Sequence, residues 1–153
     1  MKYLLLGALF KTSFLIAQNT GQSDIAGYWL NDTRDMVVKI YQKDDHTFAG
    51  DVAWLMDSLD AYNQPARDVM NDEPSKRSRM LKGVTVLHDF IWTNDAWRNG
   101  TFYNFKTGNS YGIKMSLDDK GNLRLTSYYG ILFFLSKTKV WTPVADNNLH
   151  GLK

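Results

Sequence analysis

The 153-residue sequence contains no cysteine and a single glutamate, Glu73. Without cysteine there are no disulfides, thiol nucleophiles, iron–sulfur clusters or cysteine-ligated zinc sites. Glycine-rich phosphate loops, dinucleotide fingerprints and the Gly-x-Ser-x-Gly motif are also absent. His46, His88 and His150, the only histidines, do not have the spacing of metal ligands. The sequence therefore predicts no catalytic residue, no metal site and no cofactor.

An excess of positive charge is also missing. The chain has 18 Lys and Arg against 16 Asp and Glu, and without Lys2 and Lys11 of the N-terminal segment 16 basic residues balance 16 acidic ones. Binding to nucleic acid requires clustered positive charge, so we expect no nucleic-acid partner. With 44% hydrophobic and 14% aromatic residues, a chain of this length can build one hydrophobic core.

No apolar run reaches the roughly 20 residues that a transmembrane helix needs. Residues 1–17 have a charged start, an apolar stretch interrupted by Lys11, and Ala17 at a cleavage position. This pattern predicts a signal peptide over 1–17, cut at or near Ala17, and a linker over 18–25. We then expect a periplasmic or secreted protein with no transmembrane span. A buried N-terminal helix is the alternative interpretation.

The rest of the chain consists of short, often alternating apolar runs between turn residues, which is typical of a β-sandwich or barrel. In the clearest run, Tyr111, Ile113, Met115 and Leu117 alternate with polar or small residues. The expected strands cover 26–31, 36–42, 47–55, 84–92, 100–106, 110–117, 123–129 and 132–142.

Turn signals lie between several of these runs, at Asn99-Gly100, Thr107-Gly108 and residues 119–122. Consecutive hairpins make a meander that can close on itself and remove its exposed edges. The sequence therefore predicts an all-β fold: a single antiparallel up-and-down barrel of about eight strands over 26–145, followed by a C-terminal tail over 146–153.

Residues 57–82 interrupt the strand pattern with a polar stretch that is too long for a hairpin loop. Pro74 suits the first position of a short helix, which we expect near residues 74–80. Two interpretations stay open: a lid or binding loop, or a solvated connection that covers one barrel end.

Recurring short patterns carry a resemblance to a known family. They are Gly27-Tyr28-Trp29, residues 37–41, residues 50–55, Asp68, Asn71, Pro74, Arg77, Arg79, Leu81, Gly83, Trp97, Gly100, Tyr103, Thr107-Gly108, Tyr111, Leu123, residues 128–131 and Trp141-Thr142. In order and spacing the chain resembles a bacterial family of small exported proteins with a domain of unknown function, DUF2147. The resemblance implies a lipocalin-like barrel and brings no activity or ligand with it.

Two departures from the family pattern limit what can be transferred. Members often carry a cysteine pair near the second hairpin, where this chain has Gln42 and Phe48-Ala49. Ser127 stands where glycine is expected before Tyr128. Gly27-x-Trp29 looks like the start of a lipocalin-type barrel, in which Trp29 closes one end and Lys137 or Lys139 would pack over it.

Aromatic and cationic side chains supply the candidate ligand-binding residues. They are Trp54, Arg77, Arg79, Trp97, Tyr103, Tyr111 and Tyr128. The aromatic members could line an apolar pocket with polar tips, or simply fill the core. The two arginines could receive a carboxylate or phosphate, or pair with Asp68, Asp72 and Glu73 inside the segment.

Two functional hypotheses follow. The first is an exported module that binds a small apolar or amphipathic molecule, with residues 57–82 over the barrel mouth. The second is a structural or interaction protein of the cell envelope with a filled core and no ligand. An enzyme acting through Asp51, Asp57 or Asp68 would need a carboxylate with a raised pKa in a cleft, and nothing in the sequence indicates one.

Overall fold

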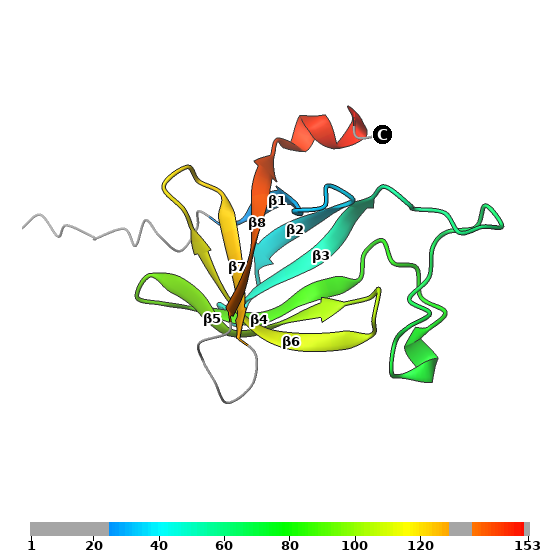
Figure 1. Ribbon diagram of the computed structural model, residues 1–153, viewed down its shortest axis with the longest axis horizontal. Helices are drawn as coiled ribbons and strands as arrows, with labels where there is room; N and C mark the ends of the chain where they lie inside the picture. Colours follow the sequence, from blue (N-terminus) through cyan, green and yellow to red (C-terminus); the bar gives the residue numbers. More distant parts are fainter. Residues whose placement is uncertain (1–24, 129–135, 152–153) are drawn as a thin grey trace, which may run out of the picture.

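The protein folds into a closed barrel of eight antiparallel strands (Figure 1). A computed structural model describes residues 25–128 and 136–151. The strands are β1 Gly27–Leu30, β2 Met36–Gln42, β3 Phe48–Leu55, β4 Thr85–Thr93, β5 Ala96–Asn104, β6 Asn109–Leu117, β7 Leu123–Tyr128 and β8 Ser136–Val144. Each strand pairs with its neighbours in sequence, and β8 pairs with β1 to close the barrel. The predicted all-β, up-and-down architecture is confirmed.

Short 3-10 helices are the remaining regular elements of the described chain: η1 Pro74–Lys76 and η2 Asp146–Gly151. The first begins at Pro74, as the fixed φ of proline favours. No helix among residues 25–128 and 136–151 is long and apolar enough to cross a membrane. The expected signal peptide over 1–17, residues 18–24 of the expected linker and residues 132–135 of the last expected strand lie outside the described residues.

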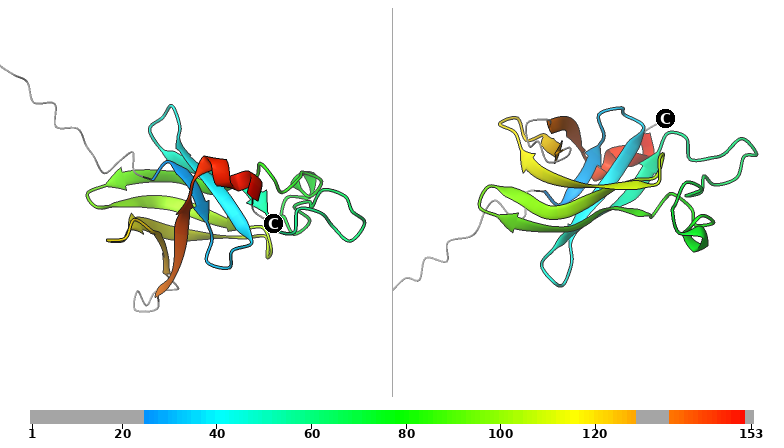
Figure 2. Two further views of the ribbon diagram at one scale, coloured as in Figure 1. Left: turned by 90° about the horizontal axis from the view of Figure 1, so that it is seen from above. Right: turned by 60° about the horizontal axis from the view of Figure 1, so that its bottom comes forward.

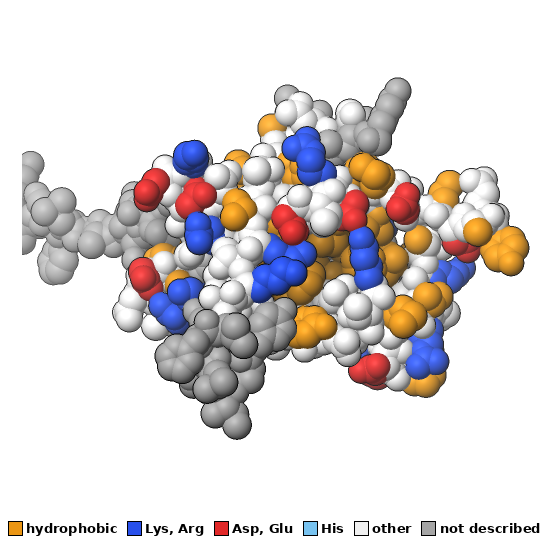
Figure 3. Space-filling model, viewed as in Figure 1, with side chains coloured by type: hydrophobic (Ala, Val, Ile, Leu, Met, Phe, Trp, Pro, Cys, Tyr) orange, Lys and Arg blue, Asp and Glu red, His pale blue; other side chains and the backbone are white. Residues whose placement is uncertain are grey.

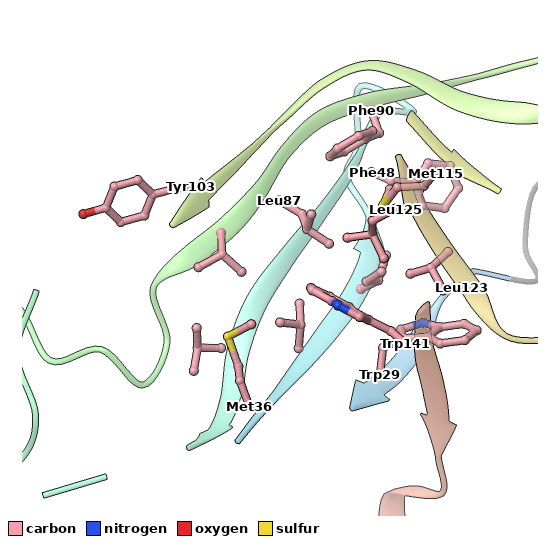
Figure 4. Packing of buried hydrophobic residues seen from close by; sticks show 14 of the residues in the cluster. Trp29, Met36, Phe48, Leu87, Phe90, Tyr103, Met115, Leu123, Leu125 and Trp141 are labelled. Carbon is pink, nitrogen blue, oxygen red and sulfur yellow. The ribbon is translucent and has the colours of Figure 1, made fainter. Parts of the chain in front are cut away.

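Large side chains fill one end of the barrel, which we call the closed end. Phe48, Phe90, Trp97 and Met115 are almost fully buried there. The Trp97 ring packs edge-on against Phe48, with centroids 6.2 Å apart, and lies 4.4 Å from the Trp92 ring. Figure 4 shows this apolar cluster continuing along the barrel to Trp29 and Trp141.

The fifth strand differs from its prediction. It begins at Ala96 rather than residue 100, because the hairpin turn lies at Asn94-Asp95, with Asn94 at φ 60°. Asn99 does adopt φ 63°, but inside β5, where the register to β6 shifts between Trp97 and Gly100. The signal at Asn99-Gly100 thus marks a β-bulge rather than a hairpin turn.

Two further expectations are corrected at the last strand. It continues beyond residue 142 to Val144, because Tyr28 of β1 still pairs with Val144. No cation packs over Trp29: in the described residues, the cation–π contacts are Lys39 over Tyr28 and Arg79 over Tyr103. The Trp29 indole N–H instead donates to the Ile25 carbonyl at 2.8 Å.

The segment between β3 and β4 projects from one end of the barrel, as Figures 1 and 2 show. Bridges between Leu59 and Pro65 and between Arg67 and Met80 fold it back on itself. Leu81 is buried and donates its N–H to the Ala66 carbonyl at 2.8 Å.

Candidate functional site

A hollow of about 250 Å³ opens at the end of the barrel opposite the closed end, and we call it the cup. Its lining comes from β2, β5, β6, β7 and β8 and from the β1–β2 turn: Asn31, Asp32, Met36, Phe102, Asn104, Tyr111, Ile113, Leu125, Ser127, Lys137, Lys139 and Trp141. In Figure 3, hydrophobic side chains are visible in a hollow with basic and acidic side chains around it.

The floor of the cup is apolar. Trp141 is 1% exposed and packs edge-on against Phe102, with ring centroids 6.2 Å apart and an interplanar angle of 77°. Met36, Ile113 and Leu125 are buried around it. These side chains offer a ligand an apolar surface at the base of an open hollow.

Charged side chains form the rim of the cup. Lys139 Nζ lies 3.2 Å from Asp32 Oδ1. Lys137 lines the same hollow, and its carbonyl accepts a hydrogen bond from Ser127 Oγ at 3.3 Å. In the described part of the chain, no carboxylate lies within 4.0 Å of the Lys137 ammonium.

The β1–β2 turn that carries Asp32 is held by side chains. Asn31 Oδ1 accepts hydrogen bonds from the backbone N–H groups of Asp35 and Met36, at 3.0 and 3.1 Å. Lys106 of the β5–β6 turn lies 2.6 Å from Asp35 Oδ2. Burial raises the pKa of Asp35, but the hydrogen bonds from Lys106, Asn31 and Thr33 outweigh it and lower the pKa to about 2. The turn is therefore a firm support for this side of the cup.

One polar group at the floor has no partner. The indole N–H of Trp141 is buried and has no hydrogen-bond acceptor among the described residues. An indole N–H without an acceptor costs free energy when buried, and such groups usually find a partner. The Trp97 indole N–H at the closed end likewise has no acceptor among the described residues, so an unpaired indole does not distinguish the cup from the closed end.

The candidate ligand residues occupy several different places. Tyr111 lines the cup, and Trp97 belongs to the packing of the closed end. Trp54 lies in a separate groove with the β3–β4 segment. Tyr128 is the last residue of β7, and its side chain lies outside what the structure describes.

Arg79 and Tyr103 meet at a buried carboxylate instead. Asp68 is fully buried and accepts hydrogen bonds from Tyr103 Oη at 2.6 Å, Asn71 Nδ2 at 2.8 Å, and Arg79 Nε and Nη2 at 2.9 and 2.7 Å. Burial, and then the hydrogen bond to Asp68, raise the pKa of Tyr103. Arg77 donates its Nε–H to the Asn71 carbonyl at 2.7 Å.

We call Asp68, Asn71, Arg79 and Tyr103 the Asp68 network. Figure 4 shows Tyr103, a member of the buried cluster, pointing away from Trp29 and Trp141, so this network lies at the edge of the barrel core. It fastens the β3–β4 segment to β5. The segment leaves β3 after Leu55, which pairs with the cup residue Met36, and so lies at the same end of the barrel as the cup. None of the residues that line the cup belongs to 57–82, and a segment over the barrel mouth stays a prediction.

A second apolar surface lies on the β3–β4 segment. Trp54, Leu59, Pro65 and Met80 line a groove of about 310 Å³ together with neighbouring residues. Several large side chains of the segment are exposed: Met56, Leu59, Tyr62, Val69, Met70 and Met80. Tyr62, at 85% exposure, contributes almost nothing to the packing of the domain.

Most of the cup residues were missed by sequence reasoning. A signal for them exists in β8, where Lys137, Lys139 and Trp141 alternate and therefore share one face. Within the described residues, no group of three or more His, Asp or Glu side chains could hold a metal ion.

The comparisons with known proteins agree on the fold. A solved structure titled "Protein HP1028 from the human pathogen Helicobacter pylori belongs to the lipocalin family" has a TM-score of 0.69 and 24% identity to this chain, covering 83% of it and 87% of the other. At that identity the likeness establishes the fold. No curated protein matches the chain. Residues 27–143 match a family described as an uncharacterized protein conserved in bacteria, DUF2147. The resemblance noted in the sequence is thus confirmed, and the chain belongs to the DUF2147 family of bacterial proteins, with a lipocalin-like barrel.

Proposed function

We propose that this protein binds a small apolar or amphipathic molecule in the cup. The observation that carries the proposal is the uneven filling of the barrel. Trp97, Phe90 and Phe48 pack one end solidly, whereas at the other end residues 25–128 and 136–151 leave a hollow of about 250 Å³ over an apolar floor. Phe102 and Tyr111 are only partly buried in this hollow, and a ligand can cover the apolar surface that they leave open to solvent.

The size of the cup favours a compact ligand. Its volume is below the roughly 300–1,000 Å³ of sites that hold drug-sized molecules. The opening to solvent at the rim leaves room for a polar group. A ligand with a short apolar body and one polar end therefore fits better than a long lipid that must be fully enclosed.

Chemical denaturation with and without small amphipathic compounds tests this function. A compound present at a hundred times its Kd raises the free energy of unfolding by about 2.7 kcal/mol. We expect at least one compound with a short apolar body to do so, and to shift the amide resonances of Ile113 and Leu125 more than those of Phe90 and Trp97. Absence of stabilisation, or shifts confined to surface residues outside the cup, would count against the proposal.

The second candidate function is that of an interaction protein of the cell envelope. It is supported by the exposed apolar side chains on the β3–β4 segment, because contiguous apolar surface marks contact sites. The test is crosslinking in envelope extracts with Val69→Ser/Met70→Ser and with Val140→Ser as the control on the barrel wall. Loss of a crosslinked protein partner in the first variant alone supports this function, and identical crosslinking in all three proteins contradicts it.

Export belongs to the proposal as well. The charged start and apolar stretch of residues 1–17 support cleavage near Ala17 and a periplasmic or secreted location. Mass spectrometry of the chain recovered from the periplasm or medium tests this point. A protein found only in the cytoplasm with residues 1–17 intact would contradict it.

A further inference from the structure

We infer that the cup is selective for small organic anions, in which a compact apolar body carries one carboxylate that Lys137 receives at the rim. This inference rests on the proposed function and names the chemical class of its ligand. It is built from the order of side chains along β8 and from the pairing of the charges that surround the cup.

The wall contributed by β8 presents donors at three successive inward positions. Lys137, Lys139 and Trp141 are each two residues apart, so their side chains share the face that lines the cup. The Cα atoms of the two lysines are separated by roughly 7 Å along the strand. The buried indole N–H of Trp141 has no acceptor among the described residues. The donors of this wall that a carboxylate at the rim can reach are therefore the two lysine ammonium groups.

The charges of the rim do not cancel. Lys139 is engaged with Asp32 at 3.2 Å, whereas Lys137 has no carboxylate within ion-pair distance in the described parts of the chain. The two lysines and the one aspartate that line the cup leave one positive charge unmatched. A cationic ligand would be repelled by it, and a carboxylate would complete the pairing.

Because Lys137 lies above an apolar floor, the two ends of such a ligand contribute separately to the binding free energy. The apolar body covers Phe102 and Tyr111, which line the cup and are only partly buried, and the carboxylate stays at the rim beside Lys137, where it keeps contact with water. Burying the carboxylate at the floor would cost far more, because charge is expensive to remove from water without a partner. The arrangement thus fixes the orientation of the ligand.

Asp32 opposes the same ligand. Its carboxylate competes for Lys139 and repels a second carboxylate at the rim. Replacing Asp32 by asparagine removes this repulsion and releases Lys139 for the ligand. A gain of affinity on removing a charged residue is a result that a merely structural role of Asp32 does not produce.

Isothermal titration calorimetry with octanoate and 1-octanol tests the inference, because the two probes share an eight-carbon chain and differ in charge. We expect octanoate to bind about tenfold more tightly, in line with one charge-assisted contact partly screened by solvent. Salt should weaken octanoate binding and leave 1-octanol unaffected. Lys137→Gln should remove the preference, Asp32→Asn should enlarge it about threefold or more, and Lys120→Gln, in the β6–β7 turn, should change neither.

The outcomes separate this inference from the proposed function. Equal affinities for both probes, with no effect of Lys137→Gln, would overturn anion selectivity while the cup remained a binding site. Failure of both probes to bind would overturn the binding function itself. Weaker octanoate binding in Asp32→Asn would contradict the role given to Asp32.

Discussion

Removing the carboxylate of Asp68 should destabilise the protein strongly, although this residue lies at the edge of the barrel core. The side chain is fully buried and accepts four hydrogen bonds: two from Arg79 and one each from Asn71 and Tyr103. In Asp68→Ala, the Tyr103 hydroxyl loses its acceptor, whereas Asn71 Nδ2 still reaches Tyr103 Oη at 2.9 Å. Arg79, at 37% side-chain exposure, can turn toward solvent.

The expected loss of folding free energy follows from what happens to each of these hydrogen-bonding groups. An unsatisfied buried donor costs about 1–3 kcal/mol, and removing one partner of a buried charge pair costs about 3–5 kcal/mol. Because Arg79 is partly solvated and one bond of Asn71 survives, we expect a loss near the lower limit, about 3 kcal/mol. Part of it should appear as detachment of the β3–β4 segment from β5.

Urea denaturation followed by tryptophan fluorescence measures the global loss, and limited proteolysis between residues 56 and 84 measures the local one. Asp72→Ala is the matched control, since Asp72 is an exposed neighbour of the network. We expect it to change the free energy of unfolding by less than about 0.5 kcal/mol. A loss below about 1 kcal/mol in Asp68→Ala, or equal losses in the two variants, would refute this account of the network.

Two further predictions concern the turns. The pKa of Asp35 in the folded protein, about 2, lies below its ordinary 3.8, so the ion pair with Lys106 contributes stability above pH 4 that is lost as the pH falls toward 2. Because the Lys106 side chain is 62% exposed, screening by solvent limits this contribution to about 1 kcal/mol. Lys106→Gln should therefore flatten the acid limb of the urea-stability profile. Gly108→Ala should cost more than Gly121→Ala: both glycines have φ near 77°, but only at Gly108 would a Cβ lie 2.1 Å from a backbone oxygen, that of Met70. The first substitution should lower the free energy of unfolding by about 2 kcal/mol or more and the second by about 1 kcal/mol, and equal losses would contradict the close approach.

The fold could be predicted because its signals are local. Alternation from Ser110 to Leu117 fixes which face of β6 is buried, and Gly108 and Gly121 adopt the positive φ expected at the turns. The bulge in β5 could not be separated from a turn by sequence, since Asn99 has positive φ in either case. The bulge lies at a close tertiary contact that sequence does not reveal: a Cβ on Gly100 would lie 2.4 Å from the nearest atom of the Phe90 ring.

The site was harder to predict because it depends on which strand ends meet. Tyr103 and Tyr111 both lie on predicted strands, yet Tyr111 faces the cup and Tyr103 faces the Asp68 network. The lysines of β8 were expected to pack over Trp29, whereas closure of the barrel places Lys139 beside Asp32 of the β1–β2 turn. Alternation gives two faces for every strand, and only the assembled barrel says which residues border a hollow.

The central claim is that a ligand binds inside the barrel, and filling the cup with a larger side chain tests it most directly. Ser127 lines the cup, and Thr126 beside it faces outward, where its hydroxyl lies 3.1 Å from that of Thr138. In a fluorescence titration with the neutral compound N-phenyl-1-naphthylamine, we expect saturable binding to the unaltered protein and to Thr126→Trp, and at least tenfold weaker binding to Ser127→Trp. Equal binding by both variants, or no saturable binding to the unaltered protein, would contradict a ligand site inside the barrel.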